Sequence, residues 1–495
     1  MGELRVVIVG AGMSGLYMAK MLADRGIGFT VLEKAGEVGG TWRDNRYPGL
    51  SVDIPAARYQ LEFSPKYDFS AAFPSGPEIQ DYLVGVTDEH DLRRHIRFGV
   101  EVVDCRWTGG EWLLTLSDGD ELGADVVVAA TGFLRVPTLP RLPGLDSFAG
   151  PAFHSSAWPE GLELAGKRIG IVGSGSSGIQ LTAELGARGH AVTQFVRTPQ
   201  WIETNLNPAL APDELDRARS GPEQGAEVLA ALMGRIGQDP RLSDPYWKLA
   251  GAGDKRPLAQ QALRDDVAAI RDPELRAALT PDFPPGCKRI PKSPTYYDVV
   301  QRENVRIVRA GVERVVPEGL VTPDGTVHEL DVVVWATGFD THAYTSPMTV
   351  HGRDGRTLHE VWAGRPYSYR GVSVPGFPNL FLLHGPFSPI NNVPVPDTLR
   401  DETGYLCRLV EIAARDQVAL EPTHEATEAF RARLAELIPQ TVWGSGCTSW
   451  YQGADGLPVI WPWFEAEHRA LFADLAEQDL LRVPLGVPVA AGEGA

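Results

Sequence analysis

Two glycine-rich turns, each between an apolar strand and a helix, constrain the fold of this chain more than any other feature. The first turn follows a continuous apolar run at 4–9 and leads into a helix that we expect to end near Arg25. The second follows a similar run at 167–172, and the helix expected after it covers 179–188. Continuous apolar runs are typical of strands buried in a parallel sheet, so the pattern predicts two βαβ units. The turn residues are Gly10, Gly12, Ser14 and Gly15 in the first unit and Gly173, Gly175, Ser176, Ser177 and Gly178 in the second.

A G-x-G-x-x-G turn in this context predicts a dinucleotide site, because the helix N-terminus offers free N–H groups to a pyrophosphate. The residue at the end of the next strand indicates which dinucleotide binds. In the first unit it is Glu33, whose carboxylate can accept the ribose hydroxyl protons and repels a 2′-phosphate, so FAD or NAD is expected. In the second unit it is Arg197, followed by Thr198, which favours the 2′-phosphate of NADPH. Together the two sites predict a flavoprotein that is reduced by NADPH.

A strand that occurs in two near-copies, at 125–133 and 331–339, indicates how the units are connected. Each copy ends in a Thr-Gly turn. We interpret the first as closing the opening unit and the second as closing an inserted unit. The sequence therefore predicts an α/β fold with two Rossmann-like domains, in which the NADPH domain (141–339) is inserted into a discontinuous FAD domain (1–140 and 340–495).

Two segments are candidates for the walls of a substrate pocket. One is a helical excursion at about 213–279, for which a solvated helical cap is the favoured alternative, and the other is the loop at 387–391.

The charge and hydropathy of the chain exclude several kinds of partner. The formal net charge is −18 over 495 residues, which argues against nucleic acid and against an anionic membrane surface. No run of about 18 apolar residues is present, so no membrane-spanning helix is expected. The N-terminus has no signal-peptide pattern, so none is expected there.

The cysteines are Cys105, Cys287, Cys407 and Cys447, and they show neither a C-x-x-C pair nor the spacing of a zinc site. We therefore expect no metal site and a reducing, cytoplasmic setting. The absence of a closely spaced pair after the first unit also argues against a two-dinucleotide disulfide reductase.

Two longer patterns lie outside the glycine turns. The first covers 39–53 and includes Gly40, Thr41, Trp42 and Asp53. The second contains Phe148, Gly150, His154, Trp158 and Pro159. Both resemble the fingerprints of type I Baeyer–Villiger monooxygenases, within the class B flavin-dependent monooxygenases. The second matches F-x-G-x-x-x-H-x-x-x-W-(P/D) at every fixed position, which would occur by chance about 10⁻⁴ of the time. The resemblance covers nearly the whole chain.

The resemblance implies an NADPH- and O₂-dependent enzyme that inserts one oxygen next to a ketone carbonyl through a C4a-peroxyflavin, giving an ester or lactone. An anionic peroxide needs a fixed cation, and a guanidinium supplies one without losing its proton. The resemblance assigns this role to Arg289, with Asp53 as its paired carboxylate and Lys288 as a contact of the 2′-phosphate. It implies that His154 positions the domains. Other cofactor contacts are implied at Gly40, Thr41, Trp42, Tyr59 and Val102 for FAD and at Gln180 and Trp450 for NADPH.

Other functions remain as alternatives. Oxygenation of sulfur or nitrogen by the sister class uses a protonated hydroperoxide and needs no Asp–Arg pair, and the fingerprint ending in Trp158-Pro159 favours the ketone reaction. A non-catalytic flavin-binding protein would not need Arg197 or the Lys288-Arg289 pair. Many relatives carry Ser-His at positions 56–57, where this chain has two alanines, so a relative's substrate cannot be assumed here. The expected partners are a small-molecule ketone and O₂.

Overall fold

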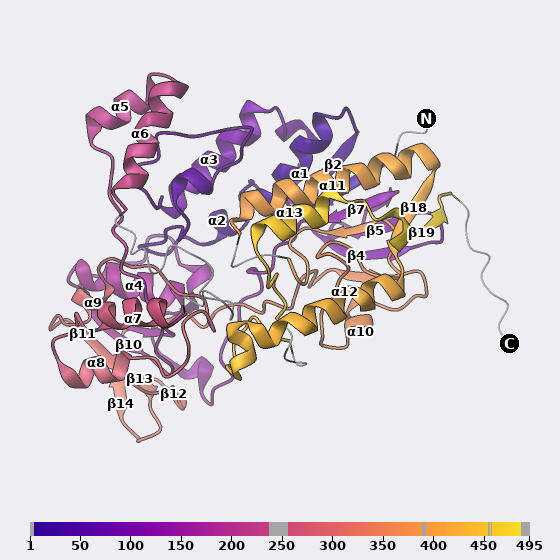
Figure 1. Ribbon diagram of the computed structural model, residues 1–495. Coiled ribbons are helices and arrows are strands. Elements are labelled where there is room, and N and C mark those ends of the chain that lie inside the picture. The colour runs from indigo at the N-terminus through magenta and orange to yellow at the C-terminus, as the bar shows by residue number, and fades with distance from the viewer. Residues whose placement is uncertain (1–3, 237–255, 389–392, 454–455, 457, 487–495) are drawn as a thin grey trace.

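Two parallel five-stranded sheets organise the molecule, one in each half (Figure 1). The computed structural model describes residues 4–236, 256–388, 393–453, 456 and 458–486. Helices cover the sheets, and three smaller sheets complete the fold. The expected α/β class is confirmed.

The first sheet contains the first glycine turn and has the strand order β17-β7-β1-β2-β3. Its strands are β1 (Val6–Val9), β2 (Phe29–Glu33), β3 (Ile96–Phe98), β7 (Val126–Ala129) and β17 (Leu380–Leu382). All four residues of β1 are buried valine or isoleucine, which suit a central strand covered on both faces. Strand β17 pairs in parallel with β7, so the chain returns to this sheet after it has built the second one.

The second sheet contains the second glycine turn and has the order β11-β10-β9-β15-β8. Its strands are β8 (Ala152–His154), β9 (Arg168–Val172), β10 (Ala191–Phe195), β11 (Val305–Val308) and β15 (Val332–Trp335). Strand β8 comes from the second fingerprint and pairs in parallel with β15 at the sheet edge. This fingerprint is therefore part of the second sheet as well as the connection that leads into it.

The two near-copies of one strand carry the same ion pair, which we call the Arg–Asp clasp. In the first sheet, Arg5 donates its backbone N–H and its guanidinium to Asp125, at 2.8 and 2.6 Å. In the second sheet, Arg168 makes the same two contacts to Asp331, at 2.8 and 3.0 Å. Each clasp joins the start of a central strand to the start of the strand beside it.

The remaining elements complete the two halves. The helices are α1 (Met13–Ala23), α2 (Thr41–Asp44), α3 (Gly76–Glu89), α4 (Ser176–Ala187), α5 (Pro212–Arg219), α6 (Pro222–Gly234), α7 (Arg256–Val267), α8 (Pro273–Leu279), α9 (Tyr296–Val299), α10 (Leu358–Trp362), α11 (Val395–Asp416), α12 (His424–Leu437) and α13 (Glu465–Ala473). The smaller sheets consist of β4 (Val102–Trp107), β5 (Trp112–Leu116), β6 (Glu121–Ala124) and β16 (Thr349–His351); of β12 (Arg314–Val316), β13 (Gly319–Val321) and β14 (Val327–Glu329); and of β18 (Val418–Pro422) and β19 (Leu480–Pro484).

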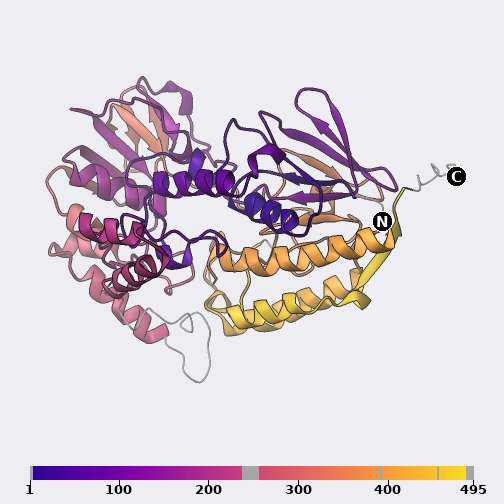
Figure 2. The same ribbon diagram turned by 90° about the horizontal axis from the view of Figure 1, so that it is seen from above.

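The long helix α11 belongs to the core of the first half. It lies alongside the C-terminal helices, as Figure 2 shows, and packs against α1. Its side chain Glu402 is fully buried and accepts hydrogen bonds from the backbone N–H of His384, at 3.1 Å, and from the Ser388 hydroxyl, at 2.5 Å. Burial raises the pKa of Glu402 to about 8, and these two hydrogen bonds only partly oppose the shift.

Candidate functional site

One large cavity, of about 1050 Å³, runs between the two glycine turns. Its volume is at the upper end of the usual range for ligand pockets, about 300–1,000 Å³. The predicted site residues that line it are Gly10, Gly12, Ser14, Glu33, Gly40, Thr41, Trp42, Asp53, Tyr59, Val102, Ser176, Ser177, Gln180, Lys288, Arg289 and Trp450. The others, Gly15, Gly173, Gly175, Gly178, Arg197 and Thr198, belong to the turns or to the end of β10 and are not among its described lining residues.

The first turn leaves room for an anion at the start of α1. Gly10 has a φ of +107°, and a Cβ there would meet the carbonyl oxygen of Ala130 at 2.6 Å. Gly12 precedes the helix, and no side chain caps the N-terminus of α1. Gly40 lies against Gly12, since a Cβ on Gly40 would be 3.1 Å from the Gly12 Cα. This small-residue cradle with free N–H groups fits the pyrophosphate of FAD.

Glu33 ends β2 beside this turn, where the sequence placed it, and it is only 4% exposed. Its carboxylate accepts hydrogen bonds from the backbone N–H groups of Ala11, at 2.8 Å, and Ala35, at 2.9 Å. It also forms a buried ion pair with Arg43, at 2.9 Å, which sequence reasoning missed. A carboxylate has about four acceptor positions, so three contacts leave capacity for a ribose hydroxyl.

Two aromatic side chains predicted to contact the flavin also contact each other. The Trp42 indole N–H donates to the Tyr59 hydroxyl at 3.1 Å, and their rings meet edge to face. Val102 begins β4 and is buried at the wall of the same cavity. The wall also includes Ala57.

The second turn is joined to the first half by a chain of side-chain hydrogen bonds. The Ser177 hydroxyl donates to Tyr47 Oη at 3.1 Å, and Tyr47 donates to Gln180 Oε1 at 2.8 Å. Gln180 Nε2 in turn donates to the Ser51 carbonyl at 2.9 Å. No side chain caps the N-terminus of α4, so its N–H groups are available to an anion, as in the first unit. Gln180 therefore has a structural contact in addition to its predicted cofactor role.

Two basic side chains lie close together beyond the second turn. Arg197 is exposed at the end of β10, and Lys288 lies half-buried on a separate loop with its Nζ 4.7 Å from the Phe283 ring centre. Burial and the nearby charge of Arg197 both lower the pKa of Lys288. Adjacent like charges are destabilising unless an anion joins them, so the arrangement favours a phosphate. Thr198 uses its carbonyl to accept a hydrogen bond from Ser174, at 2.6 Å.

The predicted catalytic pair is assembled between the two turns. Arg289 donates Nε to Asp53 Oδ2 and Nη2 to Asp53 Oδ1, both at 2.6 Å, which is a bidentate ion pair. Burial favours the neutral form of each group, but the opposite charge outweighs it, so the pKa of Asp53 is lowered and that of Arg289 is raised. Both groups are therefore held in their charged forms. The Tyr451 hydroxyl has no well-aligned hydrogen-bond partner among the described residues, yet it lies close enough to Arg289 to influence its pKa.

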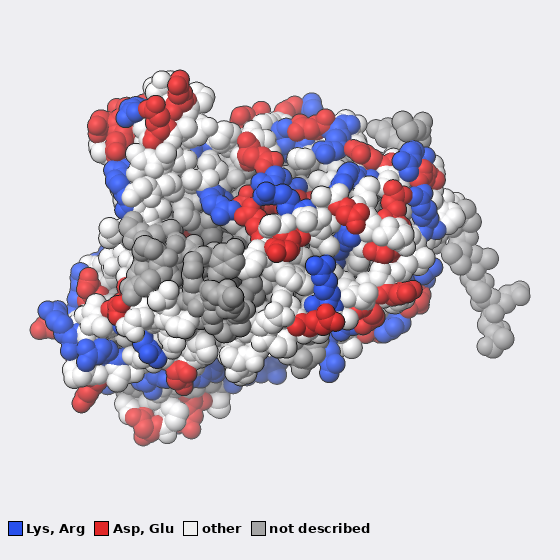
Figure 3. Space-filling view, viewed as in Figure 1, with Lys and Arg blue, Asp and Glu red and all other residues white. Residues whose placement is uncertain are grey.

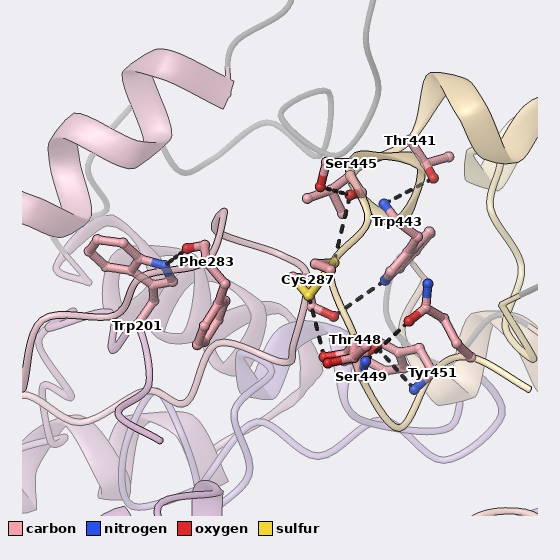
Figure 4. The surroundings of a disulfide bond; sticks show 12 residues. Trp201, Phe283, Cys287, Thr441, Trp443, Ser445, Thr448, Ser449 and Tyr451 are labelled. Carbon is pink, nitrogen blue, oxygen red and sulfur yellow. Dashed lines mark hydrogen bonds between the residues drawn. A yellow bond between two sulfur atoms is a disulfide. The ribbon is translucent and has the colours of Figure 1, made fainter. Parts of the chain in front are cut away.

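Two of the four cysteines form a disulfide that their spacing in the sequence did not predict. Cys287 and Cys447, which are 160 residues apart in sequence, form a disulfide with a Cα–Cα distance of 6.2 Å. Figure 4 shows Cys287 beside the C-terminal segment that contains Trp443, Ser445 and Tyr451. Cys105 and Cys407 are free and buried. Spacing failed as a guide because tertiary folding, not local sequence, brings the two sulfurs together. The cysteine spacing therefore no longer supports a reducing setting, and a cytoplasmic location stays a prediction.

The second fingerprint is a packed structural element. His154 is 4% exposed, and its Nε2 lies 2.9 Å from the Gly338 carbonyl just beyond β15. The backbone N–H of Ser156 donates to His154 Nδ1 at 3.1 Å, so Nε2 carries the proton toward Gly338. Burial lowers the pKa of His154, which keeps the ring neutral. Trp158 meets Phe153 edge to face, a Cβ on Gly150 would overlap the Asp331 carbonyl, and both Phe148 and Pro159 are half-buried nearby.

Sequence reasoning missed a second ion pair in the cavity wall. Lys292 lies 3.4 Å from Glu203, and an isolated β-bridge pairs their two backbone segments. Burial raises the pKa of Glu203, and the charge of Lys292 opposes the shift. It also missed His384, which lines the cavity and shares a 3.1 Å hydrogen bond with Ser14 of the first turn. The lysine three residues after Arg289 was a signal that could have revealed the Lys292–Glu203 pair. No local signal in the sequence points to His384.

The structure places the two segments that were expected to form pocket walls differently. The end of the second excursion helix, α6, contributes Met233 to the cavity, with Ile236 just beyond it, so part of the excursion is a wall rather than a solvated cap. Of the loop at 387–391, Phe387 is buried among aromatic rings, and positions 389–391 lie outside the described residues.

The surface adds two observations. Basic and acidic side chains alternate over the face drawn in Figure 3, so this face presents no field of one sign. Within the described ranges, every helix is too short or too polar to cross a bilayer.

Similar proteins identify the family. A family model described as pyridine nucleotide-disulphide oxidoreductase matches residues 7–233. A Baeyer-Villiger monooxygenase from Streptomyces coelicolor is 38% identical over 503 aligned residues, which cover 99% of this chain and 95% of that protein. An uncharacterized monooxygenase from Mycobacterium tuberculosis is 40% identical and covers 96% of both chains. The structure of cyclohexanone monooxygenase from Rhodococcus sp. Phi1 bound to NADP+ has a TM-score of 0.84 at 30% identity, covering 97% of this chain and 99% of that one. The chain therefore belongs to the type I Baeyer–Villiger monooxygenases.

Proposed function

We propose that this protein is an FAD-containing monooxygenase that uses NADPH and O₂ to convert a small-molecule ketone into an ester or lactone. The observation that carries the proposal is the bidentate Asp53–Arg289 pair, at 2.6 Å, in the cavity shared by the two glycine turns. A heteroatom oxygenase has no need for this pair, because its oxidant is used in the protonated form. The pair therefore favours the ketone reaction over oxygenation of sulfur or nitrogen.

The two cofactors have separate sites in this proposal. The first turn would hold the pyrophosphate of FAD, and Glu33 would bind its adenine ribose. The second turn would hold NADPH, and Arg197 and Lys288 would bind its 2′-phosphate. The cradle of Gly12 and Gly40 and the two adjacent basic groups support these placements. When bound, reduced FAD supplies the chemistry that activates O₂ and delivers one oxygen atom.

Arg289 provides a fixed positive charge that would stabilise the negative charge that develops during the reaction. Its two donors are oriented by Asp53, and its raised pKa keeps the guanidinium charged at neutral pH. Because the charges of Asp53 and Arg289 sum to zero, the carboxylate also weakens the electric field of the guanidinium outside the pair. His154 takes no part in proton transfer, because both ring nitrogens already have protein partners.

The domain division remains part of the proposal: an FAD domain at 1–140 and 340–495, with an NADPH domain at 141–339. The pairing of β17 with β7 and of β15 with β9 supports it, because each pair unites strands on the same side of this division.

Product analysis by mass spectrometry tests the proposed activity. The purified holoenzyme is supplied with NADPH, ¹⁸O₂ and a mixed panel of ketones and thioethers. Esters or lactones that contain one ¹⁸O atom are expected. Sulfoxides alone would contradict the proposal and assign the enzyme to the heteroatom class. A parallel reaction without NADPH controls for chemical oxidation by O₂.

A further inference from the structure

The Cys287–Cys447 disulfide joins two segments that both contribute to the nucleotide side of the cavity. Lys288 and Arg289 directly follow Cys287, and Trp450 and Tyr451 follow Cys447 by three and four residues. Lys288, Arg289 and Trp450 line the cavity. The crosslink therefore fixes the loop with the predicted phosphate and catalytic groups against the segment at 441–451.

Non-covalent contacts also join the two sides of this junction, where the Tyr451 hydroxyl lies close enough to Arg289 to influence its pKa. The Trp443 indole N–H donates to the Cys287 carbonyl at 3.3 Å (Figure 4). The apolar contacts form a small cluster of their own, which consists of Cys287, Val442, Trp443, Tyr451 and Ile460, with Phe283, Cys447 and Trp450 packed against it. Trp443 and Tyr451 are almost completely buried in this cluster, so the covalent bond reinforces an apolar contact between the two segments.

The junction can also accommodate the reduced form. Cys287 Sγ lies 3.7 Å from the Thr448 carbonyl oxygen, and Cys447 Sγ lies 3.7 Å from the Val442 carbonyl oxygen, contacts that Figure 4 shows as dashed lines. In the dithiol form each S–H would have an acceptor in reach, so reduction leaves neither thiol without a partner.

We propose that the Cys287–Cys447 disulfide is a reversible positioning element for the NADPH site. When it is oxidised, it holds Lys288 and Arg289 in place beside Trp450, and when it is reduced, these side chains lose part of their preorganisation. A dithiol breaks the S–S bond, transfers two electrons and two protons to give two protein thiols, and becomes a cyclic disulfide. Hydrogen peroxide reverses the change, since two thiols and one peroxide give the disulfide and two waters.

This inference rests on the proposed NADPH site, and the expected effect falls on nucleotide binding. Losing the preorganisation of Lys288 and Arg289 should weaken NADP⁺ binding about tenfold, which corresponds to about 1.4 kcal/mol. FAD binding should change little, because none of the described contacts of the crosslink reaches the first turn.

The test begins with the redox state of the cysteines in the full-length holoenzyme. After treatment with hydrogen peroxide and removal of the excess, thiol titration in denaturant should find two free thiols, and after dithiothreitol it should find four. Peptide mapping should identify Cys287 and Cys447 as the pair. Four free thiols in the peroxide-treated protein would overturn the proposal.

The second measurement is NADP⁺ titration of both forms, followed by the change in flavin absorbance. The reduced form and the Cys447→Ser variant should both bind about tenfold more weakly, with a rise in KM for NADPH that exceeds the change in kcat. Cys407→Ala, which removes a buried thiol elsewhere, is the matched control and should remain sensitive to dithiothreitol. Equal affinity in both forms overturns this proposal alone, whereas no NADP⁺ binding in either form overturns the proposed nucleotide site as well.

Discussion

Glu402 gives a stability prediction whose size follows from its surroundings. The side chain is fully buried on α11, and its pKa is raised from an ordinary 4.5 to about 8. In a neutral carboxyl one oxygen can accept from the His384 N–H while the protonated oxygen donates to the Ser388 hydroxyl. The glutamine amide can make the same two contacts through its oxygen and its NH₂ group. Glu402→Gln should therefore keep the local structure and remove the titration.

The sign and size of the effect follow from proton linkage. Below pH 4.5 Glu402 is protonated in both the folded and the unfolded state, so its titration does not lower the free energy of unfolding. As pH rises toward 8, the unfolded state loses its proton while the folded state keeps it, and the free energy of unfolding falls by about 1.4 kcal/mol per pH unit. Above pH 8 the total loss in the free energy of unfolding approaches about 5 kcal/mol. About 2.5 kcal/mol of this loss occurs between pH 5.5 and 7.5.

Urea unfolding of the FAD-saturated wild type and variant, at pH 5.5, 6.5 and 7.5, measures this difference. The stability of Glu402→Gln relative to wild type should increase by about 2.5 kcal/mol across the series. Glu411→Gln, an exposed position on the same helix, is the control and should stay within about 0.5 kcal/mol at every pH. A difference between Glu402→Gln and wild type that does not vary with pH would refute the argument, because it would mean that Glu402 ionises like an exposed carboxyl.

Three further predictions concern the cofactors and the reaction. Arg289→Ala should bind FAD and be reduced by NADPH but form ester at least about 100-fold more slowly, as measured by product analysis, because the fixed charge is lost; ester formation at the normal rate would contradict the assigned role. Arg197→Ala should raise the KM for NADPH roughly tenfold and leave that for NADH nearly unchanged, since one charge-assisted contact to phosphate is removed. Equal effects on both nucleotides would exclude the phosphate contact, and Arg188→Ala, exposed on the same unit, serves as the control. Glu33→Gln should lower the flavin content after gel filtration and cost about 1–2 kcal/mol of stability, because Arg43 loses its buried ion pair with Glu33 and keeps the one with Asp44; full flavin retention would count against the ribose contact.

Local patterns in the sequence were sufficient for the fold class and for many of the residues that line the cavity. The glycine turns could be predicted because strand, turn and helix are adjacent in the chain, and β1 and β2 fall where the apolar runs placed them. The Asp53–Arg289 contact, between residues 236 positions apart, was expected only because the sequence resembles a known family. Composition and spacing alone could not have paired them.

The features that sequence reasoning missed all depend on distant segments meeting in three dimensions. Arg43 reaches Glu33 through the fold of the first fingerprint, and Cys287 meets Cys447 across 160 residues. His384 becomes a wall residue because β17 returns to the first sheet, which brings the end of that strand beside Ser14. No local signal encodes such contacts, because each depends on the packing of whole elements.

The Arg–Asp clasp, present once in each sheet, provides an internal replicate within a single polypeptide. The same residue types make the same contacts at the same place in a sheet, with the arginines 53% and 47% exposed and the aspartates 14% and 31% exposed. In the first copy the clasp joins β1 to β7, in the sheet that the chain re-enters at β17, and in the second it joins β9 to β15. Hydrogen exchange of the neighbouring amides would therefore compare one type of interaction in two chain connectivities, at two levels of aspartate exposure.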